Sequence, residues 1–330
     1  METVQDTSRL DEQITQAREL LQRAKDELAK QIIGQQSMID GLLMGIIGGG
    51  HVLLEGVPGL AKTLTVRTLA EVVDAGFKRI QFTPDLLPAD LIGTMIYRQQ
   101  TGEFVPRKGP VFSNIVLADE INRAPAKVQS ALLEAMAEHQ VTIGDNTYPL
   151  PDPFFVLATQ NPIEQEGTYP LPEAQLDRFM LKLSIEYPTF EEEMKVLSLI
   201  GTDKQVQVKR VLLKQDIKRL RELANDITVD ERIQEYIVTL VRKTRETRRT
   251  VHGMARYIEF GASPRGSLAL LRCSRIHALM NGRSFVVPED VKAIAQNVLR
   301  HRLVLSYEAE SEELHVDEVL NHLLTAIPVP

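Results

Sequence analysis

The sequence predicts an α/β fold, in which helices cover both faces of a parallel sheet, followed by an all-α domain. Three observations lead to this prediction. Short apolar runs without polar alternation are separated by helical patterns in the first half of the chain, as in buried parallel sheets. A glycine-rich turn follows the first apolar run and precedes a helical stretch. From about residue 189 onward the periodicity is mostly helical.

Composition excludes several classes of protein. The chain has 330 residues, of which 43% are hydrophobic and 25% charged, so it is not a largely disordered chain. Its one cysteine, Cys273, cannot form an intramolecular disulfide, and we expect a cytoplasmic protein. The net charge of −7 argues against nucleic acid as a partner. No apolar run is long enough to span a bilayer, so we expect no membrane insertion.

Two helices are expected before the sheet, over residues 9–30 and from about residue 37 to residue 47. The segment Ile32-Ile33-Gly34-Gln35 breaks the helical pattern between them. Another helix is expected to begin at Pro125, because proline is favoured in the first turn of a helix. The apolar runs that predict strands are residues 51–54, 79–82, 114–117, 154–158 and 181–185.

Two stretches interrupt the α/β pattern, at about 94–112 and 140–153. Turn residues between β-forming residues predict that both are hairpins. They lie within the first domain, which we expect to be an α/β nucleotide-binding core over residues 1–187 with its two helices at 9–47.

The second domain is expected over residues 188–330. Thr189 and Glu192 have the spacing of a capping box, which predicts a helix start close to the boundary. The domain is expected to be all-α. Its clearest helical patterns are residues 215–225, 229–245, 264–280, 288–299 and 317–325.

The strongest motif is a phosphate-binding loop at residues 56–63. Small residues let backbone N–H groups curl around an anion, and the following helix start adds partial positive charge. We expect Lys62 to contact the phosphates of ATP and the Thr63 hydroxyl to bind Mg²⁺. Ala61 stands where the strict pattern has glycine, so a helix-like backbone is expected there. The nucleotide-binding residues predicted in this loop are Gly56, Val57, Pro58, Gly59, Leu60, Ala61, Lys62, Thr63 and Leu64.

A second motif is the apolar run that ends in Asp119 and Glu120. A pair of carboxylates at a strand end is what a Walker B element needs. We expect Asp119 to help hold Mg²⁺ through its water shell, and Glu120 to act as general base on the attacking water. The alternative is an acidic helix cap before Pro125.

Three further polar residues are candidates for contact with the γ-phosphate. Asn161 ends an apolar run, Arg178 precedes the last predicted strand, and Arg265 lies in the first turn of a predicted helix. A cation is disfavoured in a first turn unless an anion is near, which favours a phosphate partner for Arg265. The alternatives are a turn residue for Asn161, a local ion pair for Arg178 and a protein carboxylate as partner for Arg265.

Residues 56–63, 114–125, 158–162 and 176–179 together resemble the MoxR family of AAA+ ATPases. The resemblance covers about residues 30–310. It implies a P-loop AAA+ core with a helical lid, usually assembled as a hexameric ring. The family belongs to the helix-2-insert group, related to magnesium chelatase ATPase subunits, so the two hairpins would be that insert and the pre-sensor-1 hairpin.

The resemblance also implies roles for single residues. By position Asn161 resembles sensor 1, Arg178 resembles the arginine finger that acts on the neighbouring subunit's nucleotide, and Arg265 resembles sensor 2. Whether Arg265 acts in cis or in trans stays open. Gly34 and Gln35 belong to a segment similar to the one that packs near adenine.

The function expected from this resemblance is that of an ATP-hydrolysing chaperone, with ATP and Mg²⁺ as cofactors. Such proteins remodel or mature protein complexes or metalloenzymes with a von Willebrand factor A domain partner. Two alternatives stay open: an AAA+ DNA motor, helicase-like or clamp-loader-like, and an ATP-dependent scaffold that does not hydrolyse ATP. The histidines His51 and His139 are expected to be structural, because they show no metal-ligand spacing.

Overall fold

The structure is a computed structural model, and it describes residues 2–56, 62–161, 167–200, 207–246 and 254–330. Internal contacts divide the chain into two units. The sheet unit consists of Arg23–Phe179 and Leu183–Lys218, and the helical unit of Met1–Gln22, Met180–Lys182 and Arg219–Pro330. The boundary between core and lid near residue 187 stays a prediction.

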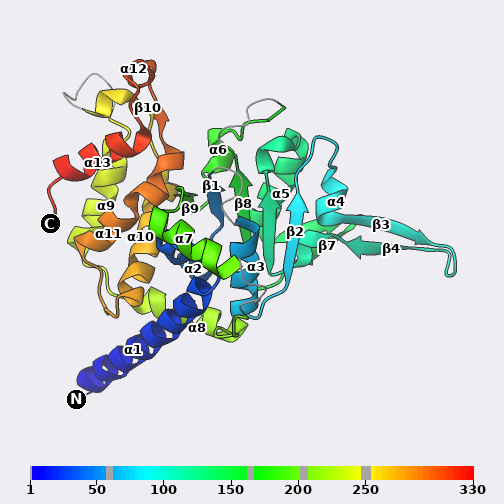
Figure 1. Cartoon of the computed structure of the whole chain (residues 1–330), viewed down its shortest axis with the longest axis horizontal. Helices are drawn as coiled ribbons and strands as arrows, with labels where there is room; N and C mark the ends of the chain where they lie inside the picture. Colours follow the sequence, from blue (N-terminus) through cyan, green and yellow to red (C-terminus); the bar gives the residue numbers. More distant parts are fainter. Residues whose placement is uncertain (1, 57–61, 162–166, 201–206, 247–253) are drawn as a thin grey trace. The chain divides into compact units, whose positions relative to one another are not determined.

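A five-stranded parallel sheet forms the centre of the sheet unit, with the strand order β2-β5-β8-β1-β9 (Figure 1). All five predicted apolar runs are strands. Strands β5 and β8 are buried along their whole length except at the last residue, which explains why their sequences do not alternate. The strands are β1 Val52–Glu55, β2 Phe77–Gln81, β5 Ile115–Asp119, β8 Phe155–Gln160 and β9 Leu181–Ser184.

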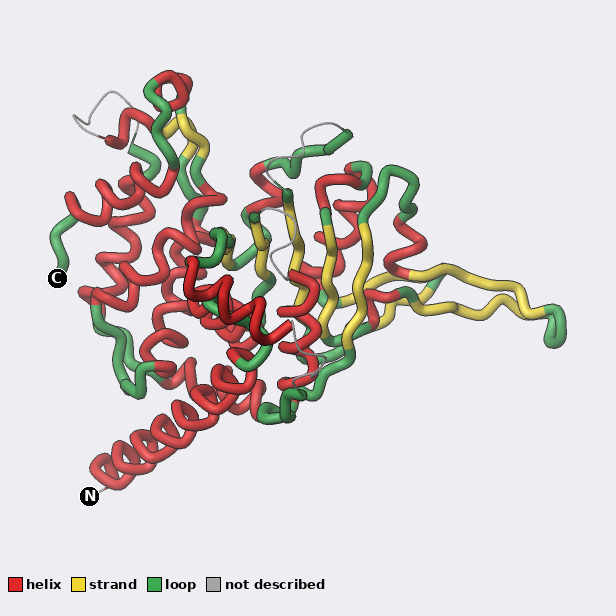
Figure 2. Tube along the Cα trace, in the orientation of Figure 1, coloured by secondary structure: helices red, strands yellow, loops and turns green. Residues whose placement is uncertain are grey.

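Helices surround the strands, as the tube of Figure 2 shows. The expected helices are present, but the first begins at residue 2 rather than residue 9. The second is buried on almost every side and ends where Gly49 adopts a left-handed backbone, with φ 63°. The helices in the first part of the chain are α1 Glu2–Ala29, α2 Gln36–Gly48, α3 Lys62–Val72, α4 Pro88–Ile92, α5 Ala126–Glu138, α6 Glu173–Leu176, α7 Phe190–Ile200 and α8 Lys214–Asp226.

Both predicted hairpins are confirmed. Strands β3 (Gly93–Arg98) and β4 (Glu103–Lys108) pair antiparallel, as do β6 (Gln140–Ile143) and β7 (Asn146–Pro149). The β3–β4 hairpin extends away from the sheet (Figure 1).

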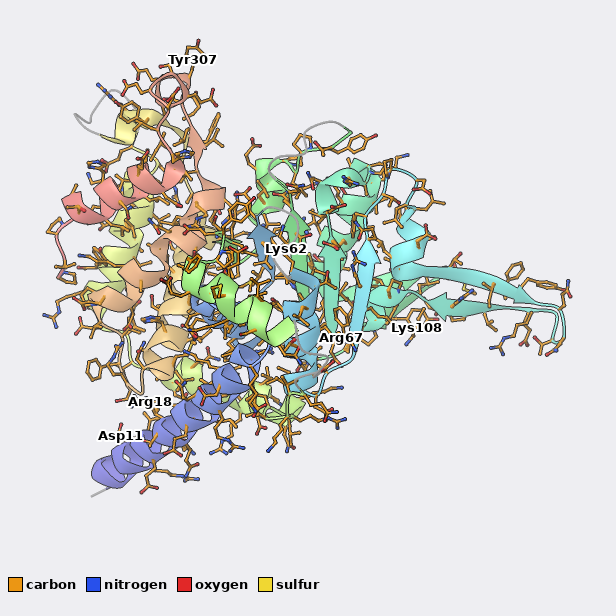
Figure 3. All side chains as sticks on the ribbon, in the orientation of Figure 1. Asp11, Arg18, Lys62, Arg67, Lys108 and Tyr307 are labelled. Carbon is orange, nitrogen blue, oxygen red and sulfur yellow. The ribbon has the colours of Figure 1, made fainter. Side chains whose placement is uncertain are left out.

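A cation–π contact joins the bases of the two hairpins. The Lys108 ammonium lies 4.8 Å from the centre of the Phe112 ring and 5.3 Å from that of Tyr148 (Figure 3). Lys108 ends β4 and Tyr148 lies in β7, so this side chain is one of the contacts between the two hairpins.

The helical unit follows the predicted pattern with one difference. Strands β10 (Ile258–Phe260) and β11 (Val304–Leu305) form a short antiparallel ribbon, where an all-α domain was expected. Segments of two or three residues are too short to show a period of two in the sequence. The helices are α9 Glu231–Lys243, α10 Pro264–Met280, α11 Pro288–Leu299, α12 Tyr307–Ser311 and α13 Val316–Ala326. Within the part of the chain that the structure describes, no helix has the length and apolar character needed to cross a membrane.

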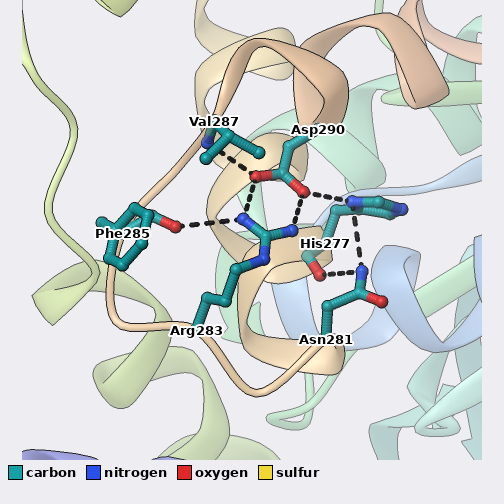
Figure 4. Close-up of polar contacts among 6 residues, drawn as sticks. All are labelled: His277, Asn281, Arg283, Phe285, Val287 and Asp290. Atoms are coloured by element: carbon teal, nitrogen blue, oxygen red, sulfur yellow. Dashed lines mark hydrogen bonds and ion pairs between the residues drawn. The ribbon is translucent and has the colours of Figure 1, made fainter.

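One buried carboxylate organises the start of α11 (Figure 4). Asp290, with no exposed surface, accepts a hydrogen bond from the Val287 backbone N–H at 2.8 Å. It also accepts from Arg283 at 2.6 and 2.5 Å and pairs with His277 Nδ1 at 2.6 Å. Burial raises the pKa of Asp290, but the hydrogen bonds from Arg283 and His277 outweigh burial and lower that pKa to about 2.

Replacing this carboxylate tests how much the helical unit depends on it. We expect Asp290→Ala to lower the free energy of unfolding by about 3–5 kcal/mol, because the partly buried Arg283 and His277 and the Val287 N–H all lose their partner. Because the pKa is lowered, this contribution is complete above the ordinary value of 3.8 and is lost as the pH falls to about 2. Urea denaturation of both proteins measures the difference.

The matched control is Glu318→Ala. Glu318 makes the same capping hydrogen bond, to the His315 backbone N–H at 2.9 Å, but its side chain is exposed. Its loss is expected to cost about 1 kcal/mol. Equal losses for the two variants would contradict a special role for Asp290.

Candidate functional site

Three neighbouring strands end at the same edge of the sheet and carry the predicted motifs there. In the register of the parallel pairs, Glu55 of β1 lies beside Gln160 of β8, and Ala118 of β5 beside Ala158 of β8. The residues that follow these strands are therefore brought together, as expected at the carboxyl ends of parallel strands. They are Gly56 after β1, Glu120 after β5 and Asn161 after β8.

Lys62 begins α3 and lies over this edge (Figure 3). Its ammonium donates to the backbone carbonyl of Gly56, and to that of Gln160 at 3.4 Å. Burial lowers the pKa of Lys62, and the nearby carboxylates of Asp119 and Glu120 oppose that shift. The ammonium therefore contacts the chain at the ends of β1 and β8 and is influenced by the charges of the two acids at the end of β5.

The rest of the predicted phosphate loop is only partly described. Thr63 is the second residue of α3 and half-buried, and the Leu64 side chain is exposed. The expectation of a helix-like backbone at Ala61 falls outside the described residues, as do four further loop residues: Val57, Pro58, Gly59 and Leu60.

Asp119 is held by donors from two strands. Its Oδ2 accepts hydrogen bonds from Nε and Nη2 of Arg79 on β2, at 3.0 and 2.7 Å. Its Oδ1 accepts from the hydroxyl of Thr159 on β8, at 2.7 Å. Charge-assisted bonds of this kind are short and directional, so the carboxylate is fixed by the chain's own residues.

Glu120 is fixed through both its backbone and its side chain. Its backbone is left-handed, with φ 56° and ψ 52°, and its N–H donates to the Thr159 hydroxyl at 2.8 Å. Its Oε2 accepts from Gln81 Nε2 at 2.8 Å and pairs with Arg123 Nε at 3.2 Å. The side chain makes no capping hydrogen bond to the short helix that follows, and the N-cap residue of α5 is Pro125, without a side-chain cap, so an acidic cap before Pro125 is not seen.

Sequence reasoning missed three residues of this arrangement: Arg79, Gln81 and Thr159 as partners of the acids. A signal for two of them exists in β2, where Arg79 and Gln81 are separated by one residue and so share a face. Both lie near the carboxyl end of an edge strand beside the strand of Asp119.

The two candidate arginines lie in different units. Arg178 is exposed in the sheet unit, and its Nη1 donates to the carbonyl of Leu133 in α5 at 2.8 Å. Arg265 is exposed in the first turn of α10, where its backbone N–H donates to the Ser263 hydroxyl at 3.1 Å. Asn161 is buried directly after β8. The roles of Asn161, Arg178 and Arg265 toward a nucleotide stay predictions.

The segment predicted to lie near adenine is fixed against the chain that follows the sheet. Gly34 has φ +74°, a backbone conformation that favours glycine because residues with a side chain rarely adopt it. Gln35 Nε2 donates to the carbonyl of Glu186 at 3.2 Å. Contact of Gly34 and Gln35 with adenine stays a prediction.

The buried histidine beside the sheet has a structural environment, as expected. His51 Nδ1 accepts from the Val156 N–H at 3.0 Å, and its Nε2 lies 3.1 Å from the Met136 carbonyl oxygen. Burial lowers the pKa of His51 to about 4, so the ring is neutral. The His139 ring lies against it, with ring centres 6.0 Å apart.

Two family models match the chain. The one described as "ATPase family associated with various cellular activities (AAA)" matches residues 51–181, and "AAA lid domain" matches residues 253–323. Chaperone MoxR1 of Mycobacterium tuberculosis is 49% identical over 311 residues, covering 94% of this chain and 82% of that protein. The chain belongs to the MoxR family of AAA+ ATPases.

Two further matches cover nearly the whole chain. Protein MoxR of Methylorubrum extorquens is 31% identical over 341 residues, covering 97% of this chain and 98% of that protein. A solved structure described as a candidate ATPase from Cytophaga hutchinsonii is 48% identical and superposes with a TM-score of 0.90. That match covers 98% of this chain and 99% of the solved one.

Membership of the MoxR family implies ATP binding with Mg²⁺ in general. Within the described ranges, no group of three or more His, Cys, Asp or Glu side chains could hold a metal ion. Mg²⁺ in nucleotide sites is bound by one or two carboxylates together with phosphates and water. Asp119 beside the start of α3, which carries the Thr63 hydroxyl, is a donor set that fits this mode of binding.

The hydroxyl of Thr159 offers a direct test of the geometry. Thr159→Val leaves the part-buried Glu120 N–H and one Asp119 oxygen without the Thr159 hydroxyl, and should lower the free energy of unfolding by about 1–3 kcal/mol. Thr159→Ser keeps the hydroxyl and should recover most of the loss. The control is Thr142→Val, whose hydroxyl pairs with Thr147 on an exposed hairpin and whose loss should stay within about 0.5 kcal/mol. A Thr159→Val protein as stable as wild type would refute the contact.

Proposed function

We propose that this protein is an ATP-hydrolysing chaperone of the MoxR type. The observation that carries the proposal is the meeting of Lys62, Asp119 and Glu120 at one edge of the sheet, with both acids held by hydrogen bonds. Arg79 and Thr159 hold Asp119 from two strands, and Gln81 contributes the contact to Glu120. The name of the relative Chaperone MoxR1 supports the chaperone class.

Each residue then has a part in phosphate transfer to water. Lys62 contacts the β- and γ-phosphates, and Thr63 with Asp119 holds the cation, which when bound neutralises charge on the phosphates. Glu120 takes a proton from the attacking water. The Oε2 of Glu120 accepts from Gln81 and pairs with Arg123, and these two contacts hold the carboxylate.

The proposal extends to assembly. Arg178, exposed at the surface of the sheet unit, would stabilise the charge that develops on a neighbouring subunit's nucleotide in a hexameric ring. Asn161 would orient the water or sense the γ-phosphate, and Arg265 would contact phosphate from its helix start. A von Willebrand factor A domain protein and a protein client as partners, and a cytoplasmic location, rest on the family resemblance.

The Glu120→Gln variant tests hydrolysis. It should keep ATP binding, because the amide fills the same space, and lose turnover by about 10²–10⁴-fold, because it cannot accept the proton. Phosphate release measures turnover, and isothermal titration with ATP and Mg²⁺ measures binding.

Glu138→Gln, at the exposed end of α5, is the matched control and should behave as wild type. Unchanged phosphate release from Glu120→Gln would overturn its role, and wild type that binds ATP without turnover would favour the scaffold.

Mixing two inactive variants tests the role of Arg178. Arg178→Ala should lower turnover by roughly 10³-fold, as for other arginine fingers, and Lys62→Ala should lose ATP binding. In mixed rings some interfaces combine an intact Lys62 with an intact Arg178, so part of the activity should return. Full activity of Arg178→Ala alone at every protein concentration would exclude an action in trans.

A further inference from the structure

Gln129 of α5 has no exposed surface, and its amide nitrogen donates to three backbone carbonyls. The acceptors are the carbonyls of Ile121 at 3.2 Å, Ala124 at 3.1 Å and Tyr169 at 2.9 Å. A carbonyl can only accept, so the nitrogen of the amide must face these groups and the oxygen must face away from them. The orientation of the Gln129 amide is therefore fixed.

The three carbonyls belong to two separate segments. Two of them lie within residues 121–124, the turn that directly follows Glu120. The third is that of Tyr169, in the segment that leads to α6 and Arg178. The Tyr169 N–H adds to this contact, because it donates to the Asn122 carbonyl at 2.6 Å. Gln129 thus fastens the turn after the second acid to the segment that leads to the arginine.

The chain itself joins these two segments only by a long route. After the turn it runs through α5, the β6–β7 hairpin and β8 before it returns at Tyr169. A connection of this length does not determine where its two ends lie relative to each other. The Gln129 amide, by contrast, reaches the Tyr169 carbonyl directly across 40 positions of sequence.

The same helix contacts the returning segment at two further places. Ser130 Oγ accepts from Gln175 Nε2 at 3.4 Å, and the Leu133 carbonyl accepts from Arg178 Nη1 at 2.8 Å. At about 100° per residue, the three α5 positions 129, 130 and 133 lie within roughly 100° of one another around the helix axis. One side of α5 therefore holds both the segment and the guanidinium at its end.

We propose that Gln129 is a positioning residue for Arg178. It holds the segment that carries the arginine against the turn after Glu120, and so places the guanidinium for the nucleotide of a neighbouring subunit. The proposal rests on the proposed ATPase function in a ring, and deepens it by naming the contact that links a subunit's own site to the arginine it offers to the next.

Mixed rings separate this role from any effect of Gln129 on the subunit's own site. In a mixture of Arg178→Ala with Lys62→Ala, the first protein supplies intact nucleotide sites. The second, here called the donor, binds no ATP and supplies only the arginine. A further change in the donor alters turnover only through the arginine that it offers, provided that the donor still enters the rings.

The test adds Gln129→Met to the donor. Methionine is close to glutamine in shape but donates no hydrogen bond. It also removes Oε1 of Gln129, a buried atom without a partner among the described residues, so part of the lost stability is recovered. Phosphate release should fall at least about tenfold relative to the mixture with the unmodified donor, because small displacements of a catalytic group are costly. Sedimentation velocity checks that both donors enter rings to the same extent.

Two further donors complete the design. Gln234→Met is the matched control, since Gln234 is exposed on α9 and its Nε2 donates to the Val229 carbonyl at 3.1 Å. It should leave phosphate release from the mixture unchanged. Gln175→Ala removes the contact with Ser130 and should lower phosphate release by about threefold, because part of the support for the arginine is lost.

The possible results distinguish this inference from the function on which it rests. If the mixture of Arg178→Ala with Lys62→Ala has no activity, the proposed action in trans fails, and the inference fails with it. If that mixture is active and the Gln129→Met donor supports the same phosphate release, only the inference fails. If the Gln129→Met donor does not fold or does not enter rings, Gln175→Ala decides: unchanged phosphate release with that donor would overturn the positioning of the arginine by α5.

Discussion

The parallel pairing of β5 with β8 is the constraint on which the candidate site depends. It places the Thr159 hydroxyl where it donates to Asp119 Oδ1 and accepts from the Glu120 N–H. One buried hydroxyl thus fixes an acid by its side chain and the next acid by its backbone. A change of register by one residue would turn Thr159 to the other face of the sheet and separate all three groups.

Asp290 and Asp119 both pair with an arginine, and the difference between their environments is informative. Asp290 has no exposed surface, and donors from Val287, Arg283 and His277 surround it. Asp119 is 13% exposed and keeps an acceptor position on Oδ1 that no described residue takes. Asp290 therefore has the environment of a structural carboxylate. Asp119 has the environment of a carboxylate able to bind a ligand, although a guanidinium contacts both residues.

The sequence predicted those parts of the fold and site that rest on local patterns. Unalternated apolar runs identified all five strands, because burial on both faces removes polar residues from a strand. The acids after β5 were found because they stand next to each other. The ribbon of β10 and β11 was missed, because its two segments lie more than 40 residues apart and are too short for periodicity. The same applies to Arg79, which meets Asp119 across 40 positions and only once β2 pairs with β5.

The backbone of Glu120 shows where stability and chemistry conflict. A left-handed conformation costs a residue other than glycine about 1–3 kcal/mol, and glycine would remove that cost. Glycine would also remove the carboxylate that Gln81 and Arg123 hold. The strain is retained at one residue, and the contact of its N–H with Thr159 offsets part of it.

The left-handed turn directs the chain away from β5 directly after Asp119, so that consecutive side chains meet different partners: Arg79 for the first acid and Gln81 for the second. The left-handed backbone thus allows two consecutive acids to contact different partners.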